Sequence, residues 1–297
     1  MNEMNVIMRR MSEFSPVELT DLWNEGFKGY SVPITMSMDM LLKRSVDQGL
    51  SLAHSIVGCV DGVPVGFVMN GLRMNDGVKT AWNGGTGIIP AFRGKGIGKL
   101  LIQASLELYK AEGAEVALLE ALSDNKPAIS LYERMGYEVI DELYFYECKS
   151  LKDESLAGGG SGEHEYRQGV PQDIQRLHLP VNNQPWQTQW ESIVNGESLI
   201  AFDPEGQPAG YALYKRGFDS NGAHTSTSLY QCKVLGEQSE GALPLMKGLL
   251  SGVFGPSSLG LTLRTVNLPG SETMLTGVLK DAGFGISVSQ VHMKRSV

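Results

Sequence analysis

Two halves of this chain resemble one another weakly, and this internal repeat limits the folds that are open to it. Residues 62–66 read Gly-Val-Pro-Val-Gly, and residues 206–210 read Gly-Gln-Pro-Ala-Gly. In the same way, Gly136-Tyr137 follows one apolar run and Gly283-Phe284 follows another. Both pairs are offset by about half of the chain, as expected where one structural unit occurs twice. We therefore expect two domains of one fold.

A glycine-rich segment separates the two copies. Residues 153–162 include the run Gly-Gly-Gly-Ser-Gly, a composition typical of a flexible linker. The length of 297 residues has room for two domains of roughly 150 residues each. We predict that residues 1–152 form a catalytic domain, that residues 153–162 link it to the next, and that residues 163–297 form the second domain.

The first half alternates predicted strands and helices, which is typical of an α/β or mixed α+β sheet. Asp61 and Gly62 stand between two apolar runs and predict a β-hairpin. Ser15 followed by Pro16 predicts the start of a helix. Beyond residue 96, apolar residues recur at helical spacing as far as Gly113, a natural helix end.

A loop rich in glycine and cations precedes that last helix. It alternates three glycines with Arg93, Lys95 and Ile97. Backbone N–H groups in such a loop can point the same way, and a helix N-terminus adds partial positive charge, so the loop suits phosphate oxygens. Lys99 stands where a dinucleotide fingerprint needs glycine, and Leu100 stands where a P-loop needs Ser or Thr. A glycine-rich turn without a ligand stays open as the alternative on these residues alone.

Further residues favour an acyl-CoA site. Residues 90–98, which read Pro-x-x-Arg-Gly-Lys-Gly-Ile-Gly, resemble the acyl-CoA-binding motif of the GNAT superfamily of N-acetyltransferases. The similarity continues downstream through Glu120, Asn125, Ala128, Tyr132, Gly136 and Tyr137. It covers residues 5–148 clearly and the second half only in outline.

The resemblance implies an α/β fold with two tandem acyl-CoA N-acyltransferase-like domains, each a twisted mixed sheet flanked by helices. The strand before the glycine loop and the strand that holds Glu120 would separate, and the pantetheine of acetyl-CoA would enter between them. The residues expected to bind this co-substrate are Ile88, Ile89, Pro90, Arg93, Gly94, Lys95, Gly96, Ile97, Gly98, Lys99 and Asn125. We expect no metal, since no Cys/His cluster has zinc spacing.

Acetyl transfer to an amine needs a base for the amine, a donor for the oxyanion and a proton for the departing thiolate. Glu120 is the predicted base, directly or through water, in an apolar strand where burial would raise its pKa. Tyr132 is the predicted acid, like the helix tyrosine of the family. The alternatives are a salt-bridged or solvent-facing Glu120 and a Tyr132 that only packs. Asn125 contacts the co-substrate or caps a helix, and the oxyanion donor is expected to be a backbone N–H near Ile88.

The second half lacks this chemistry. Leu279 stands at the position that corresponds to Tyr132. Residues 233–241 have lost the alternating glycines and gained acids, which would repel phosphate. We predict that residues 163–297 are a degenerate acetyltransferase-like domain that supports the first domain or forms a wall of its acceptor cleft.

The composition indicates which binding partners and which cellular compartment to expect. The net charge of −8 argues against general nucleic-acid binding. No apolar run reaches the roughly 18 residues of a membrane span, and three isolated cysteines fit a reducing cytoplasm. We expect a cytoplasmic N-acetyltransferase that modifies a primary amine of a small molecule or protein. A homodimer stays open, and a non-catalytic acyl-CoA sensor is the alternative function.

Overall fold

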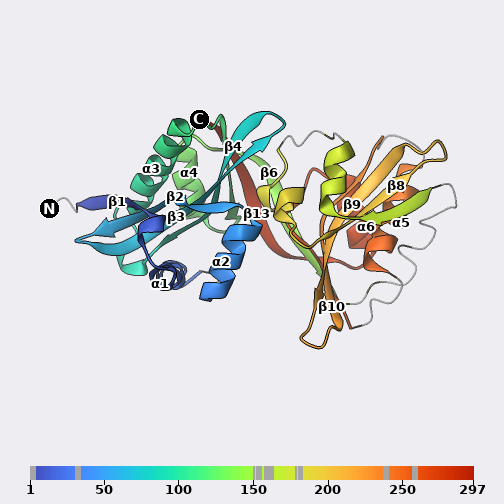
Figure 1. The fold of residues 1–297 in the computed structure, drawn as a ribbon, viewed down its shortest axis with the longest axis horizontal. Coiled ribbons are helices and arrows are strands. Elements are labelled where there is room, and N and C mark those ends of the chain that lie inside the picture. Colours follow the sequence, from blue (N-terminus) through green and yellow to red (C-terminus); the bar gives the residue numbers. More distant parts are fainter. Residues whose placement is uncertain are drawn as a thin grey trace. The chain divides into compact units, whose positions relative to one another are not determined.

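The computed structural model describes residues 5–30, 35–149, 151, 156, 164–177, 179, 183–236, 241–255 and 260–297. The chain divides into two compact units: Met1–Ile140 with Val291–Val297, and Asp141–Gln290 (Figure 1). The predicted linker, residues 153–162, lies outside the described residues apart from Leu156. No helix in the described part of the chain has the length and apolarity needed to cross a bilayer.

The first unit is a mixed sheet with strand order β1-β2-β3-β4-β5-β13. Strands β1 to β4 pair antiparallel, and β4 pairs with β5 in parallel. Its elements are β1 (Val6–Arg10), α1 (Pro16–Gly26), α2 (Met38–Asp47), β2 (Leu50–Val60), β3 (Val63–Asn75), β4 (Val78–Ile88), α3 (Ile97–Ala111), β5 (Val116–Leu122), α4 (Lys126–Arg134), the start of β6 (Glu138–Cys148) and the end of β13 (Gly285–Ser296). The last residues of the chain thus complete the sheet of the first unit, where the Val297 N–H donates to Glu115 O at 3.0 Å.

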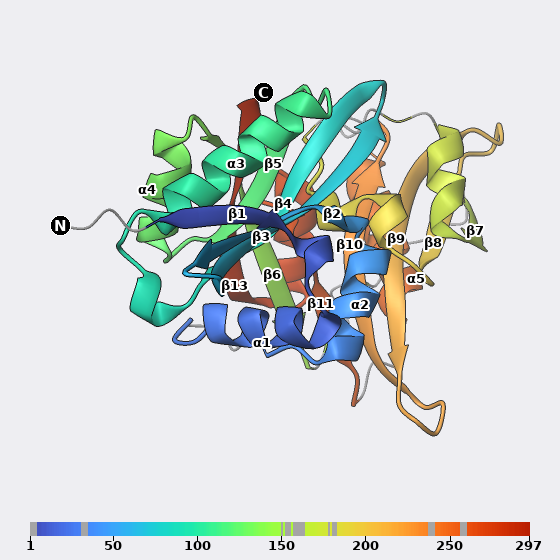
Figure 2. The same ribbon diagram turned by 60° about the vertical axis from the view of Figure 1, so that its left-hand side comes forward.

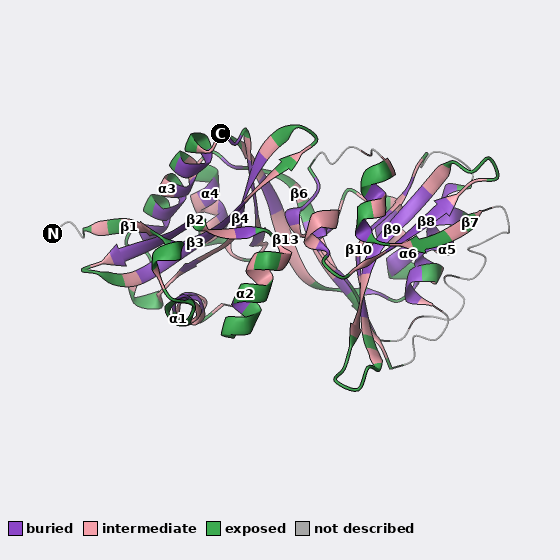
Figure 3. Cartoon of the chain, in the orientation of Figure 1, coloured by how far each residue is buried: buried purple, intermediate pink, exposed green. Residues whose placement is uncertain are grey.

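Helices cover both faces of this sheet. Figures 1 and 2 show α3 and α4 on one face and α1 and α2 on the other. A continuous apolar core joins α3 and α4 to the strands, and its buried members include Val65, Val68, Ala81, Leu101, Leu119, Tyr132 and Met293. Burial is concentrated in the central strands, as Figure 3 shows. We refer to the two sides as the α3/α4 face and the α1/α2 face.

Local sequence explains the ends of several elements. Asp61 and Gly62 both have left-handed backbones, with φ of 51° and 80°, which is the geometry of a two-residue hairpin turn. The Ser15 hydroxyl accepts a hydrogen bond from the Glu18 N–H at 3.3 Å, and the Glu18 carboxylate accepts one from the Ser15 N–H at 2.8 Å. This reciprocal capping box begins α1 where the sequence predicts it.

The second unit repeats the arrangement. Its strands lie in the order β6-β11-β10-β9-β8-β7, and β10 pairs with β11 in parallel. Its elements are β7 (Glu165–Gly169), β8 (Glu197–Phe202), β9 (Pro208–Phe218), β10 (His224–Val234), α5 (Ala242–Phe254), β11 (Thr262–Thr265), β12 (Leu268–Pro269) and α6 (Thr273–Asp281). One core joins α5 and α6 to the same sheet face. The predicted tandem of mixed sheets flanked by helices is confirmed.

Candidate active site

Strands β4 and β5 pair over four residues and then part. Their ladder runs from Thr80–Val116 to Asn83–Leu119, although β4 continues to Ile88 and β5 to Leu122. Directly after the last pair, Gly84 is an extra residue in β4, where the register with β3 shifts. Such a β-bulge bends a strand and changes the direction of the residues beyond it. Residues 85–88 therefore form an edge of β4 that is not paired with β5, which we call the unpaired edge.

Backbone groups on the unpaired edge alternate in direction. The Ile89 N–H donates to Val65 O of β3 at 2.9 Å. In an antiparallel ladder the backbone N–H and C=O of one residue face the neighbouring strand, and those of the next residue face away from it. Because Ile89 faces β3, the N–H and C=O groups of Thr86 and Ile88 point away from β3. Ile88 O accepts from Arg93 Nε at 2.9 Å, while the Ile88 N–H has no acceptor among the described residues. Of the two predicted contacts, Ile88 thus presents an N–H on the open side and Ile89 does not.

The three glycines of the loop have two different roles. Gly94 and Gly96 have left-handed backbones, with φ of 73° and 84°, and a Cβ on either would meet no atom within 4 Å. Glycine adopts this conformation at little cost. Gly98 has no such φ, but a Cβ there would lie 3.0 Å from Leu131 Cδ2 and 3.2 Å from Ile88 Cδ1. Gly94 and Gly96 therefore shape the loop, whereas Gly98 lets α3 approach α4 and β4.

The loop presents a row of backbone donors to solvent. The N–H groups of residues 94–99 have no acceptor in the part of the chain that is described, because α3 begins at Ile97 and its first turn lacks internal partners. The Arg93 N–H is different, since it donates to Pro90 O at 3.2 Å. The side chains of Lys95 and Lys99 are exposed beside these donors. This cradle fits the pyrophosphate of a coenzyme A thioester.

Tyr132 lies on the α3/α4 face beside the bulge. Its side chain is only 6% exposed, and burial raises its pKa to about 12. Hydrogen bonds with the side chains of Thr86 and Asn83 oppose part of that shift. Asn83 Nδ2 donates to Thr86 Oγ1 at 2.9 Å, and Asn83 Oδ1 accepts from the Gly85 N–H at 3.1 Å. The hydroxyl is therefore protonated at neutral pH and held where β4 and β5 part.

Sequence reasoning missed Thr86. Its only signal was a pair of polar residues, Asn83 and Thr86, on either side of two glycines in an otherwise apolar strand. Asn83 lies with Thr86 at the hydroxyl of Tyr132. The bulge at Gly84 explains this, because it brings residues 83 and 86 to the same face.

We predict that Thr86→Val lowers kcat about tenfold, since it removes one hydrogen bond that holds the Tyr132 hydroxyl and lowers its pKa. Thr86→Ser keeps the hydroxyl and should stay within about threefold of the parent. Steady-state thiol release measures both. In a Tyr132→Phe background Thr86→Val should cost nothing further, because the two side chains act as one unit. Equal losses in both backgrounds would contradict this assignment.

Glu120 lies on the opposite face from Tyr132. Its neighbours Leu119 and Ala121 belong to the core of the α3/α4 face, and side chains alternate along a strand, so Glu120 points to the α1/α2 face. Its Oε2 accepts from the Trp82 indole N–H at 2.8 Å. The fully buried Trp82 thus orients the carboxylate.

Arg44 of α2 supplies positive charge next to Glu120. Burial lowers the pKa of Arg44 to about 10, and the charge of Glu120 opposes that shift. The guanidinium also donates to Gly84 O at the bulge and to Gln48 Oε1, and it lies 4.9 Å from the Trp23 ring centroid. Nothing in the sequence distinguished Arg44 from the other cations of its helix. It ties α2 to the point at which the two strands part.

The remaining predicted residues have structural positions of their own. Asn125 caps α4, because its Oδ1 accepts from the Ala128 N–H at 3.3 Å. Pro90 begins the short 3₁₀ helix Pro90–Phe92 that leads into the glycine loop. In the described part of the chain, no group of three or more His, Cys, Asp or Glu side chains is arranged to hold a metal ion.

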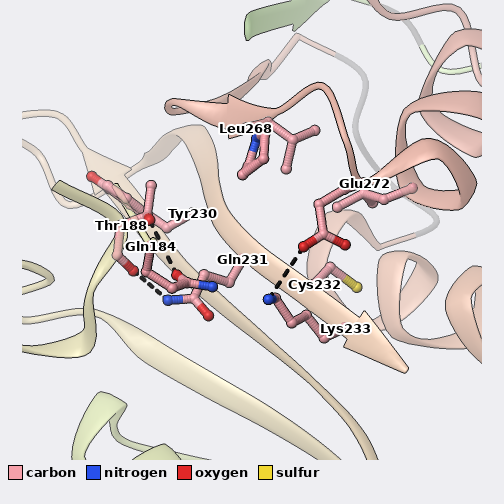
Figure 4. Close-up of a pocket in the computed structure, with 10 residues that line it drawn as sticks. Gln184, Thr188, Tyr230, Gln231, Cys232, Lys233, Leu268 and Glu272 are labelled. Atoms are coloured by element: carbon pink, nitrogen blue, oxygen red, sulfur yellow. Dashed lines mark hydrogen bonds and ion pairs between the residues drawn. The ribbon is translucent and has the colours of Figure 1, made fainter. Parts of the chain in front are cut away.

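In the second unit, an ion pair lies where strands β10 and β11 part. The β10–β11 ladder ends at Leu229–Thr265, and β10 has its own bulge at Tyr230, where the first unit has Gly84. Lys233 Nζ of β10 lies 3.2 Å from a carboxylate oxygen of Glu272, the cap residue of α6. Figure 4 shows this pair beside a small pocket. The pocket is lined by Gln184, Thr188, Tyr230, Gln231, Cys232, Lys233, Leu268, Pro269, Glu272 and Leu275.

The second unit has no tyrosine at the position that corresponds to Tyr132. The Tyr137 N–H donates to Tyr132 O after α4, and the Phe284 N–H donates to Leu279 O after α6, each at 3.0 Å. These equivalent turns place Leu279 at the position of Tyr132, as predicted. Residues 237–240 of the degenerate loop lie outside the described residues.

Comparisons with known proteins identify the class. Residues 18–137 match the family model described as "Acetyltransferase (GNAT) family". N-alpha-acetyltransferase 30 of Schizosaccharomyces pombe is 44% identical over 59 residues, which are 20% of this chain and 39% of that protein. A mycothiol acetyltransferase of Streptomyces avermitilis is 31% identical over 90 residues, which are 30% of this chain and 29% of that protein. The matches thus span well under half of either relative.

Solved structures show the same fold over the whole chain. A GCN5-related N-acetyltransferase from Sphaerobacter thermophilus aligns over 98% of this chain and 95% of its own, with a TM-score of 0.65 and 16% identity. A tandem GNAT protein from the clavulanic acid biosynthesis pathway aligns over 99% and 98%, with a TM-score of 0.61 and 17% identity. The fold is that of an acetyltransferase present twice. Residues 18–137 thus match the GNAT family in sequence, and the whole chain has the fold of tandem GNAT proteins.

Proposed function

We propose that the first unit transfers an acetyl group from acetyl-CoA to a primary amine of a small molecule or protein. The observation that carries this proposal is the arrangement around the unpaired edge of β4. The edge has the Glu120 carboxylate on one face and the buried Tyr132 phenol on the other. The row of N–H donors in the glycine loop lies at its end. The names of the relatives, an N-alpha-acetyltransferase and mycothiol acetyltransferases, support acetyl transfer.

Each requirement of the chemistry has a candidate group. Acetyl-CoA supplies a thioester, whose carbonyl carbon bonds to the amine nitrogen as the carbon–sulfur bond breaks. Glu120 accepts the proton that the amine loses, directly or through water, because an alkyl amine with a pKa of about 10.4 is protonated at neutral pH. The Ile88 N–H donates to the oxygen that becomes negative. Tyr132 donates its proton to the departing sulfur.

The α1/α2 face suggests the character of the acceptor. Trp23 and Phe67 stack at 5.4 Å, and Phe27 lies 4.6 Å from Trp23 and 4.8 Å from Tyr30, measured between ring centroids. These rings lie directly on β4, since a Cβ on Gly85 would be 3.3 Å from Trp23 and one on Gly87 would be 2.5 Å from Phe67. Trp23 and Phe67 are buried, whereas Phe27 and Tyr30 are half-buried. An acceptor with an apolar group next to its amine suits the wall that Phe27 and Tyr30 present.

A panel of amines tests the function. The full-length protein is mixed with acetyl-CoA and each of several aliphatic, aromatic, amino-sugar and peptide amines, and free thiol is followed over time. We expect thiol release that depends on the amine, with the acetylated amine found by mass spectrometry. Propionyl- and succinyl-CoA in place of acetyl-CoA measure the preference for the acyl chain.

Two results would count against the transferase. Tight acetyl-CoA binding with no amine that stimulates thiol release would favour the acyl-CoA sensor. Absence of acetyl-CoA binding would remove the donor assignment itself. Apolar amines that react no better than polar ones would contradict the proposed acceptor wall alone.

A further inference from the structure

The side chain of Arg93 turns away from the glycine loop and reaches the end of α1. Its Nη2 donates to Gly26 O at 2.9 Å and to Lys28 O at 2.7 Å, while its Nε donates to Ile88 O at 2.9 Å. The C-terminus of a helix carries partial negative charge and binds cations well. The planar guanidinium reaches three carbonyls at once, which a lysine ammonium on its flexible chain does not match.

The end of α1 is packed tightly against β4. A Cβ on Gly26 would lie 3.0 Å from Phe67 Cε1 and 3.3 Å from the carbonyl carbon of Gly87. Arg93 adds hydrogen bonds at this junction, so it joins α1, β4 and the loop that follows β4. These three hydrogen bonds use the Nε donor and both Nη2 donors, which leaves only the two Nη1 donors for a phosphate.

The segment that Arg93 holds leads to Tyr30. The chain turns at Gly29, whose φ is 79°, and the Tyr30 ring centroid then lies 5.7 Å from Arg93 Cζ. Tyr30 is also close enough to Tyr132 to affect its pKa. Residues 27–30 thus lie beside the site, in contact with Arg93 and close to Tyr132.

We propose that Arg93 is a positioning residue for the acceptor side of the site and not a ligand of the acetyl-CoA phosphates. It fixes residues 27–30, and with them Tyr30, against the end of β4. The acceptor part of this inference rests on the proposed function; the structural part does not. Arg93 therefore acts on the binding of the amine acceptor, whereas the glycines that follow it act on the binding of acetyl-CoA.

Hydrogen exchange in the free full-length protein tests the structural part. The amides of Phe27, Lys28 and Tyr30 donate to Trp23 O, Glu25 O and Phe27 O at 3.0, 3.3 and 3.2 Å, so their exchange reports on this segment. In Arg93→Met we expect these amides to exchange about tenfold faster, because local opening becomes easier. Arg93→Lys should give a smaller increase in the exchange rate, because the positive charge stays but the planar set of guanidinium N–H donors is lost.

Binding and kinetics test the functional part. The Kd for acetyl-CoA, measured by calorimetry, should stay within about threefold in Arg93→Met, while the KM for an amine substrate from the panel rises about tenfold. Lys95→Met is the reciprocal control: Lys95 is the neighbouring loop cation, with Nζ 5.2 Å from the Phe92 ring centroid. It should raise the acetyl-CoA Kd several-fold and leave exchange at residues 27–30 unchanged.

The opposite pattern would overturn the proposal. An Arg93→Met protein whose acetyl-CoA Kd rises tenfold or more, with parental exchange at residues 27–30, would make Arg93 a phosphate ligand. An Arg93→Met protein in which both the amide exchange at residues 27–30 and the KM for the amine equal those of the parent would also overturn the proposal. A parent protein that fails to bind acetyl-CoA would defeat the proposed function, while the exchange measurement would still decide the role of Arg93.

Discussion

Replacing Tyr132 with phenylalanine is expected to lower kcat by about 10²–10⁴-fold, the usual contribution of a positioned general acid. The Kd for acetyl-CoA should stay near the parental value, because only the hydroxyl is lost. The folded-state pKa of Tyr132 is raised to about 12 by burial, above the ordinary value of about 10. The phenol therefore keeps its proton, and loss of that proton should cause no decline in the parental kcat between about pH 7 and pH 10. Steady-state thiol release over this range measures both effects.

Tyr137→Phe is the matched control. Tyr137 belongs to the same core cluster, is 3% exposed, and has its ring centroid 6.1 Å from that of Tyr132. It should keep kcat within about threefold of the parent, because its hydroxyl is not assigned to the reaction. A Tyr132→Phe enzyme with parental kcat would refute the acid assignment, and equal losses in both variants would indicate damage to the core.

Changing Gly96 to glutamate should weaken acetyl-CoA binding at least about 100-fold, since two unit charges about 4 Å apart repel by about 4 kcal/mol at an effective dielectric of 20. The N–H donors of residues 94–99 surround this position, and a Cβ on Gly96 would enter open space. The new carboxylate would thus occupy the cradle without a clash in the fold. The left-handed φ of 84° adds a backbone cost of about 1–2 kcal/mol. Calorimetric titration with acetyl-CoA measures the loss of binding.

Gly113→Glu separates charge from backbone strain. Gly113 follows the other end of α3, has a φ of 70°, and likewise has no atom within 4 Å of an added Cβ. This variant should lose similar stability in thermal unfolding yet bind acetyl-CoA like the parent. Retention of parental acetyl-CoA affinity by Gly96→Glu would exclude the loop as the phosphate cradle.

Much of the first unit follows from short-range sequence signals. The turn at Asp61 and Gly62, the capping box at Ser15 and the left-handed Gly94 and Gly96 agree with the sequence because each depends on the backbone of a few neighbouring residues. The position of Leu279 was also predictable, since the turn after each helix repeats. The assigned roles of Glu120, Tyr132 and the loop donors stay predictions for the variants above.

The partners of these side chains did not follow from the sequence. The bulge at Gly84 brings Thr86 and Asn83 to Tyr132, and Arg44 to the bulge itself, but a single extra residue in a strand leaves no periodic signal. The same holds for Arg93, whose acceptors Gly26 and Lys28 lie 67 and 65 positions earlier in the chain.

By itself, the sequence determined that this chain contains a repeated mixed sheet with one glycine loop and one tyrosine of the acetyltransferase type. Those features depend on local backbone freedom, apolar periodicity and residue spacing. Only the tertiary structure decided that Val291–Val297 completes the sheet of the first unit, and that the guanidinium of Arg93 reaches the end of α1. Strand pairing and side-chain hydrogen bonds between distant segments depend on how the whole sheet packs, and such packing leaves no mark in the spacing of residues along the chain.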